Sequence, residues 1–208
     1  MLIRFELELM CGEVEPGRYI STYRGKIFDY PESVDEDNDG SEEPNVKIGE
    51  IELYYVDQTR IINEGESLYE TMDCMSVETV NCYEALVDQD EGGWKEEVQQ
   101  LISEDALIRD NILLINRLDI EEPFRGKRKG AEVVQEVISR FGSTCAVVVC
   151  KPFPLQYRGY ESEENAAERE TPGYETKRVA AFRAVAQFWK NLGFQKLPSS
   201  DHYVRIEQ

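Results

Sequence analysis

Residues 112–150 constrain the fold more than any other stretch, because their hydrophobic pattern changes period twice. An apolar strand is predicted by Ile112-Leu113-Leu114-Ile115 and Leu118-Asp119-Ile120, and apolar residues from Val133 to Phe141 then recur at helical spacing. A second strand is predicted by the continuously apolar run Ala146-Val147-Val148-Val149-Cys150, which is typical of parallel pairing with its predecessor. The order strand, loop, helix, strand predicts a β-α-β crossover and an α/β fold.

The residues before this crossover contain strand patterns followed by helical ones. Residues 1–10, 18–30 and 47–56 predict three strands of an antiparallel meander. A helical insertion is predicted at about 66–104, where apolar residues fall at helical spacing and Ser76 can cap a second segment. This insertion either covers a cleft or provides a homodimer contact.

The residues after the crossover complete the predicted sheet. Thr176 is expected to cap a helix that Gly193 ends, and residues 202–206 alternate like a closing strand. A chain of 208 residues is long enough for one well-buried core. We therefore expect residues 1–208 to form a single domain, with a mixed central sheet and flanking helices.

Charge limits the partners of this chain. There are 42 acidic and 23 basic residues, a formal charge of -19, which repels nucleic-acid backbones and favours cationic partners. The alternative is that the excess acid only keeps the protein soluble. Acidic loops are predicted at 29–45 and 158–175. Residues 35–40 match half of an EF-hand loop, but Val46 stands where the bidentate glutamate is required, so no metal site is expected.

Cysteine, histidine and hydrophobic content exclude further classes. The five cysteines form no C-x-x-C pair, so reduced thiols are expected. His202 is the single histidine, which argues against a catalytic triad and against a histidine-rich metal site. No apolar run is long enough for a membrane span, and the N-terminus alternates apolar and charged residues, unlike a signal peptide. A cytoplasmic protein is expected.

The loop between the predicted strand and helix carries the clearest candidate site. Backbone N–H groups at a helix start lack partners within the helix and can hold a pyrophosphate. Gly126 and Gly130 allow close backbone approach. The alternative is that the loop's charges only neutralise Glu121 and Glu122. We call residues 125–130 the cationic loop, because four of them are basic: Arg125, Lys127, Arg128 and Lys129.

This loop resembles the acetyl-CoA signature of the GNAT superfamily, Arg/Gln-x-x-Gly-x-Gly/Ala. Arg125 and Gly130 match the signature, whereas Arg128 stands where the middle glycine usually lies. Residues 188–194, Phe-Trp-Lys-Asn-Leu-Gly-Phe, look like the late helix of that family and its F-Y-x-x-L-G-F ending. Residues 151–156, Lys-Pro-Phe-Pro-Leu-Gln, are similar to a segment of uncharacterised bacterial GNAT-like proteins. The resemblance covers about residues 107–207 and implies a GNAT fold.

The resemblance also implies a site for acetyl-CoA or another acyl-CoA. Backbone groups of residues 118–120 would pair with the pantetheine arm, and residues 125–131 would hold the pyrophosphate beside a splayed strand pair. Trp189 stands where many members have a tyrosine acid, and an indole cannot act as an acid. The implied cofactor-binding residues are Leu118, Ile120, Arg125, Gly126, Lys127, Arg128, Lys129, Gly130 and Ala131.

Three titratable residues are candidates for catalysis. Acyl transfer needs a neutral amine, an N–H donor for the developing oxyanion and an acid for the departing thiolate. Asp119 or Glu121 could be the base and Tyr157 the acid; the alternative is solvated carboxylates and a packed tyrosine. Pro152 and Pro154 fix a stiff segment that could line an acceptor pocket.

Two functions therefore stay open. The first is an acyl-CoA-dependent N-acyltransferase whose acceptor is a cationic small-molecule amine or a basic protein. The second is a non-catalytic GNAT-like module that binds CoA or a basic protein partner. Arg128 and Trp189 favour the second function, and the intact strand-loop-helix favours the first.

Overall fold

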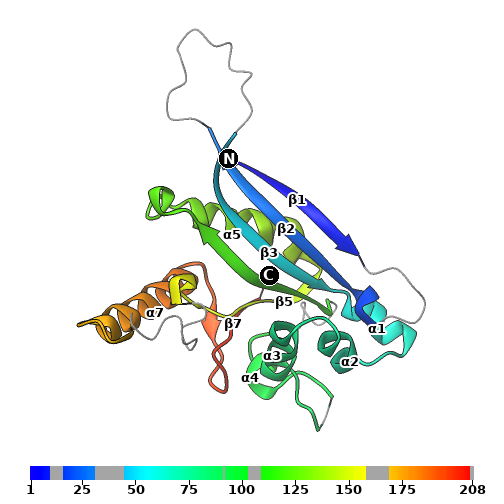
Figure 1. The fold of residues 1–208 in the computed structure, drawn as a ribbon. Helices are drawn as coiled ribbons and strands as arrows, with labels where there is room; N and C mark the ends of the chain where they lie inside the picture. Colours follow the sequence, from blue (N-terminus) through cyan, green and yellow to red (C-terminus); the bar gives the residue numbers. More distant parts are fainter. Residues whose placement is uncertain (10–15, 31–44, 91, 103–108, 158–168, 207–208) are drawn as a thin grey trace.

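The described residues of the computed structural model, 1–9, 16–30, 45–90, 92–102, 109–157 and 169–206, form a mixed α/β structure around one seven-stranded sheet (Figure 1). The strand order is β1-β2-β3-β4-β5-β7-β6. Neighbouring strands are antiparallel except β4 and β5, which are parallel. The strands are β1 (Leu2–Leu9), β2 (Ile20–Asp29), β3 (Val46–Val56), β4 (Asn111–Ile120), β5 (Cys145–Cys150), β6 (Gln195–Lys196) and β7 (Tyr203–Arg205).

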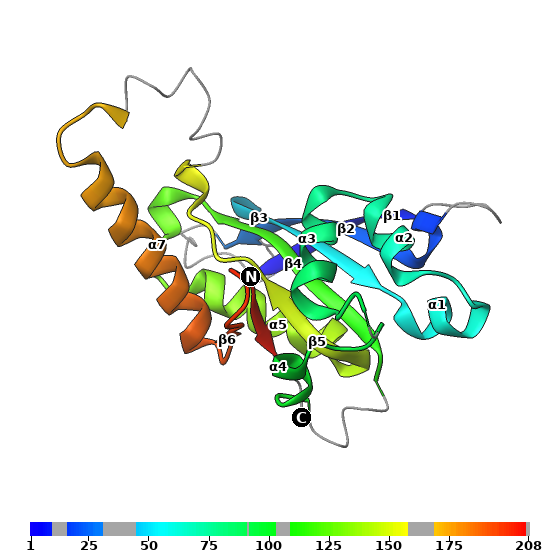
Figure 2. The ribbon, with the colours of Figure 1, turned by 90° about the horizontal axis from the view of Figure 1, so that it is seen from below.

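Helices cover both faces of the sheet, as Figures 1 and 2 show. Four short helices between β3 and β4 lie on one face: α1 (Gln58–Glu64), α2 (Leu68–Asp73), α3 (Val77–Leu86) and α4 (Glu96–Gln99). The other face carries α5 (Lys129–Phe141), which connects β4 to β5, and α7 (Tyr174–Asn191). Short 3-10 helices include Pro16–Tyr19, Glu122–Phe124, Gly142–Thr144 and Leu155–Tyr157.

The sheet separates two hydrophobic cores, because successive side chains of a strand point to opposite faces. The core under α1–α4 contains Tyr54, Val56, Ile61, Met72, Cys82, Leu86, Ile112, Leu114, Val147 and Val149. The core under α5 and α7 contains Ile51, Leu53, Leu113, Ile115, Val133, Val137, Ile138, Val148, Trp189 and Phe194. All six residues of β5 are buried, as its continuous apolar run predicts for a central strand covered on both faces.

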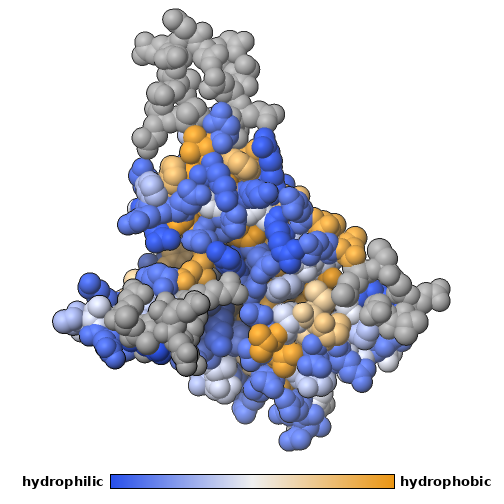
Figure 3. Space-filling model, viewed as in Figure 1, coloured by the Kyte–Doolittle hydropathy of each residue, from blue (hydrophilic) through white to orange (hydrophobic). Residues whose placement is uncertain are grey.

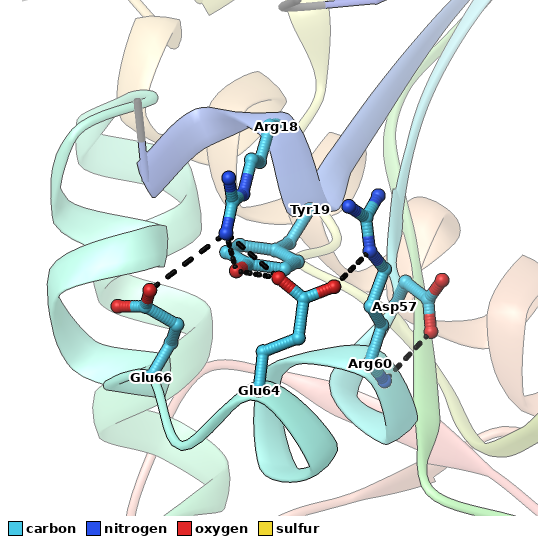
Figure 4. A network of polar contacts seen from close by, with 6 residues as sticks. All are labelled: Arg18, Tyr19, Asp57, Arg60, Glu64 and Glu66. Carbon is cyan, nitrogen blue, oxygen red and sulfur yellow. Dashed lines mark hydrogen bonds and ion pairs between the residues drawn. The ribbon is translucent and has the colours of Figure 1, made fainter. Parts of the chain in front are cut away.

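A polar network fixes α1 to the turn before β2 (Figure 4). Glu64 accepts hydrogen bonds from the Tyr19 hydroxyl and from Arg18, both at 2.7 Å, and from Arg60 Nε at 2.7 Å. The Arg18 and Arg60 guanidinium groups lie 4.8 and 5.1 Å from the centre of the buried Tyr19 ring. Hydrogen bonds from Arg60 and Tyr19 lower the pKa of Glu64. Together these contacts attach the first helix to the sheet.

The surface seen in Figure 3 is mostly hydrophilic, with separate apolar patches. Exposed apolar side chains include Leu7 and Leu9 on β1, Ile62 on α1 and Val77 on α3. No helix in the described part of the chain combines the length and the hydrophobicity that a membrane span requires.

Most of the predicted elements are confirmed. The crossover is present, with β4 and β5 parallel, and Ser76 caps α3 in a reciprocal capping box with Thr79. The capping prediction for Thr176 is wrong, because α7 begins at Tyr174 after Gly173 in the left-handed conformation. In the last part of the helical insertion predicted at about 66–104, residues 94–102 contain only the four-residue helix α4, and α1 was not predicted. The EF-hand-like residues 35–40 lie outside the described residues.

Candidate functional site

The parallel strands β4 and β5 separate before β4 ends. Their pairing runs from Asn111 opposite Cys145 to Ile115 opposite Cys150, whereas β4 continues to Ile120 beside β3. Among the described strands, none pairs with residues 116–120 on the side toward β5. We call this side of β4 the open edge.

Backbone alternation identifies which groups face the open edge. Glu121 N donates to Ile48 O at 2.9 Å, so this residue faces β3. In an antiparallel pair, residues alternate between facing the partner and facing away. Asp119 therefore faces β3, while the N–H and C=O groups of Leu118 and Ile120 face the open edge.

A β-bulge lies at the point of separation. The register with β3 pairs Leu53 with Ile115 and Glu52 with Arg117, which leaves Asn116 as an extra residue. The extra residue shifts the alternation of side chains between the two faces of the sheet. As a result, Leu118 packs on the same core under α5 and α7 as Ile115. Without it, Leu118 would point to the other face of the sheet. The bulge therefore keeps the end of β4 apolar toward α5 while it separates from β5.

The cationic loop joins the end of β4 to the start of α5. Gly126 has a φ of 76° and Arg128 a φ of 62°, and Arg128 is the only non-glycine residue with positive φ among the described residues. The Arg128 carbonyl accepts from Ala131 N at 2.9 Å and Glu132 N at 3.1 Å. This turn directs the first backbone N–H groups of α5 outward from the helix end, where they have no intrahelical acceptor.

The loop side chains have different partners. Arg125 donates from Nε to Ile120 O at 2.6 Å and lies 3.4 Å from Asp119 Oδ1. Lys129 pairs with Asp29 Oδ2 at 2.7 Å, and this hydrogen bond raises the pKa of Lys129. Within the described part of the chain, Arg125 and Lys129 thus pair with Asp119 and Asp29, rather than with Glu121 and Glu122 as the sequence suggested.

A pocket of about 210 Å³ lies where β4 and β5 separate. Its lining comes from α3, from the bulged part of β4, from the segment after β5 and from the residue before β7. The proline-containing segment contributes Phe153 and Leu155, in agreement with the prediction that it lines a pocket. The lining residues are Glu78, Asn81, Leu114, Ile115, Asn116, Arg117, Lys151, Phe153, Leu155 and His202.

His202 is the most buried polar residue of this lining. Its side chain is 4% exposed, and Nδ1 is buried without a hydrogen-bond partner among the described residues. Burial and the nearby charge of Lys151 lower the pKa of His202 to about 4, against the opposing effect of Asp201. The imidazole is therefore neutral at pH 7. Sequence reasoning did not select His202, because a lone histidine beside a short strand gives no motif.

The predicted catalytic residues do not line the pocket. Asp119 pairs with Arg117 at 3.2 Å as well as with Arg125. Glu121 is exposed at the end of β4. Tyr157 packs against the ring of Tyr174, 5.6 Å away and edge-on, and stacks with Phe182 at 6.4 Å, which agrees with the packed alternative.

Trp189 and the cysteines Cys82 and Cys145 are buried in the cores. Trp189 is 6% exposed and lies 5.0 Å from Phe194 between ring centres. Burial raises the pKa of Cys82 and of Cys145 to about 12, so both are protonated thiols rather than nucleophiles at neutral pH. Within the described residues, no cluster of three or more acidic, cysteine or histidine side chains could hold a metal ion.

Comparisons with known proteins give no relative for this chain: no family model, no curated protein and no solved structure matches it.

Proposed function

We propose that this protein is an acyl-CoA-dependent N-acyltransferase with a GNAT-type fold. The observation that carries the proposal is the continuity of three features. The helix start at the cationic loop, the open edge of β4 and the pocket at the strand separation follow one another along a single strand. The helix start can bind an anion, the open edge can pair with an extended chain, and the pocket can enclose a small group. This order suits a long ligand with a phosphate at one end and a reactive group at the other.

The sheet supports the proposal independently of the loop. The resemblance to the GNAT family implies a splayed strand pair, and the parallel strands β4 and β5 separate after Ile115. The bulge at Asn116 lies at the point of divergence. Strand order alone does not decide function, so the chemistry of the pocket must be considered as well.

The residues of the loop and edge fit a CoA. Leu118 and Ile120 offer backbone donors and acceptors of the kind that an extended amide chain requires. A Cβ built on Gly126 would meet nothing within 4 Å, so the loop has free space around it. Helix-start N–H groups and the Arg125, Lys127 and Arg128 side chains provide hydrogen bonds and positive charge for a pyrophosphate.

Acyl transfer requires few groups from this chain. The amine nitrogen bonds to the thioester carbon, the C–S bond breaks, the amine loses a proton and the thiolate gains one. Glu78 is the carboxylate among the lining residues, and its position favours it over Asp119 and Glu121 as the group that holds the amine and accepts its proton. Backbone N–H groups near the bulge are the candidates for the oxyanion donor.

One observation favours the non-catalytic alternative. Trp189 is buried in the core, so α7 offers no acid at the position where the family resemblance places a tyrosine. In this alternative the protein binds CoA, or a basic protein through its acidic residues, without transferring an acyl group.

Calorimetric titration with acetyl-CoA, free CoA and ATP tests the site. We expect acetyl-CoA and CoA to bind and ATP to bind weakly, because ATP lacks the pantetheine arm that the open edge would hold. A CoA-thiol release assay with an amine panel then tests transfer. Binding without release from any acceptor would support the non-catalytic module. No binding of either CoA form would refute the acyltransferase and leave only a module that binds a basic protein.

A further inference from the structure

We propose that the acceptor pocket selects a small amine that also carries a carboxylate, such as a free amino acid. This inference rests on the proposed function, since it names the acceptor class of that same site. It differs from the expectation based on net charge, which favours a cationic amine. The local composition of the pocket, rather than the overall charge of -19, determines which acceptor fits.

Opposite charges without protein partners are present in the pocket lining. Glu78 comes from α3, and Lys151 comes from the segment after β5. Within the described residues, neither side chain forms an ion pair, although both are among the lining residues. A ligand with an ammonium at one end and a carboxylate at the other would complement this pair, whereas a plain amine would leave Lys151 unpaired.

Two buried nitrogens add to the preference. Nδ1 of His202 and Nε of Arg117 are both buried, and among the described residues neither atom has a hydrogen-bond partner. A terminal nitrogen of Arg117 pairs with Asp119, which leaves Nε–H as a donor. A buried donor without an acceptor is costly, so a carboxylate that accepts from Arg117 Nε–H would relieve an existing penalty. The neutral His202 ring can donate to the same carboxylate only in the tautomer that carries its proton on Nδ1.

The size and walls of the pocket limit the rest of the ligand. About 210 Å³ is below the usual range for drug-sized ligands, so the pocket suits a small acceptor better than an aminoglycoside. Leu114, Phe153 and Leu155 supply an apolar wall for a side chain. The amino group would lie toward Glu78, where deprotonation prepares it for transfer.

Matched sets of acceptors test this inference. Each set contains an L-amino acid, its amide and its decarboxylated amine, so that only the carboxylate changes. With acetyl-CoA, we expect kcat/KM for the amino acid to exceed the other two at least about tenfold, the effect of one charge-assisted hydrogen bond. Equal or faster turnover of the amide or the amine would overturn the acceptor class and leave the proposed function intact.

Two lysine variants test whether the preference for a carboxylate comes from Lys151. Lys151→Gln should raise KM for the amino acid about tenfold or more and change the amine within about twofold. Lys190→Gln removes an exposed lysine of α7 that does not line the pocket, and should change neither. An equal effect of Lys151→Gln on all three acceptors would contradict a carboxylate contact.

A direct measurement of amino-acid binding tests the inference even if the transfer assay detects no release of CoA thiol. Saturation-transfer NMR of amino acids with the full chain, with and without CoA, reports pocket binding alone. Binding that Lys151→Gln abolishes would support the acceptor class while the proposed transfer activity fails. Absence of binding by every amino acid would overturn this inference, whatever CoA does.

Discussion

The guanidinium of Arg125 donates from Nε to the backbone carbonyl of Ile120 across 2.6 Å. One side chain of the cationic loop thus contacts the open edge at its end nearest the loop. The carbonyl that accepts this bond is one of the groups that the proposed pantetheine arm would use. In the proposed complex with CoA, Arg125 would exchange this backbone acceptor for a phosphate.

Replacement of Arg125 tests whether this exchange is favourable. Arg125→Ala should weaken acetyl-CoA binding about tenfold to a hundredfold, because a charge-assisted bond to phosphate is stronger than the bond to a neutral carbonyl. Calorimetry measures the change, with Lys190→Ala as the control for loss of a surface cation. Unchanged or tighter binding would mean that Arg125 only blocks the edge.

The left-handed backbone of Arg128 predicts a stabilising substitution. Arg128→Gly should raise the free energy of unfolding by about 1 kcal/mol, since a side chain at positive φ is strained and glycine is not. Urea denaturation and a Tm increase of about 2–4 °C would report it. Lys127→Gly removes an equal charge at a position without positive φ and should not stabilise. Equal effects of both substitutions would exclude relief of backbone strain.

Gly49 allows β3 to lie close to β4, the strand that carries the open edge. A Cβ at Gly49 would lie 2.2 Å from the Asp119 carbonyl oxygen, so β4 must shift if alanine is introduced. Gly49→Ala should lower the free energy of unfolding by about 1–3 kcal/mol and weaken acetyl-CoA binding to the folded fraction. Gly93→Ala, where a Cβ meets nothing within 4 Å, is the matched control. Normal stability of Gly49→Ala would contradict the close approach of the strands.

Buried His202 predicts a pH dependence of stability. Its pKa is about 4 in the folded protein and about 6.5 in the unfolded chain, so the unfolded state binds more protons between these values. Stability from this group is therefore full above pH 6.5 and falls by about 3 kcal/mol as the pH drops to 4.

A variant separates this effect from that of other titrating groups. The stability difference between wild type and His202→Asn, measured in urea at pH 7 and pH 4, should shift by about 3 kcal/mol in favour of the variant at the lower pH. A difference that does not vary with pH would show that His202 titrates normally.

The sequence predicted the crossover well because its period changes were strong. The two apolar runs of β4, at 112–115 and 118–120, even contain the phase change that the bulge at Asn116 produces. The start of α7 could not be placed, because glycine with positive φ precedes it and Thr176 offers an equally good capping side chain. The short α1 has too few residues to give a helical period and depends on the contacts of Tyr19 and Glu64.

One part of the candidate site could be predicted from the sequence, and the other part could not. The cationic loop and the open edge follow from a local pattern, so residues 118–131 could be selected from the sequence. The pocket combines Glu78, Lys151 and His202 from three distant segments, and no local pattern relates them. Tyr157 had suitable chemistry, but its packing against Phe182 depends on how α7 docks.

The division of the sheet into two cores has an evolutionary consequence. Glu78 and Asn81 lie on the α1–α4 side, whereas the helix that begins at the cationic loop packs on the other side. Mutations in α3 can alter this wall of the pocket without repacking α5, and energetic effects of such distant sites tend to add. If the proposed function holds, selection can therefore change the acceptor pocket among descendants of this chain while the half of the structure around α5 stays constant.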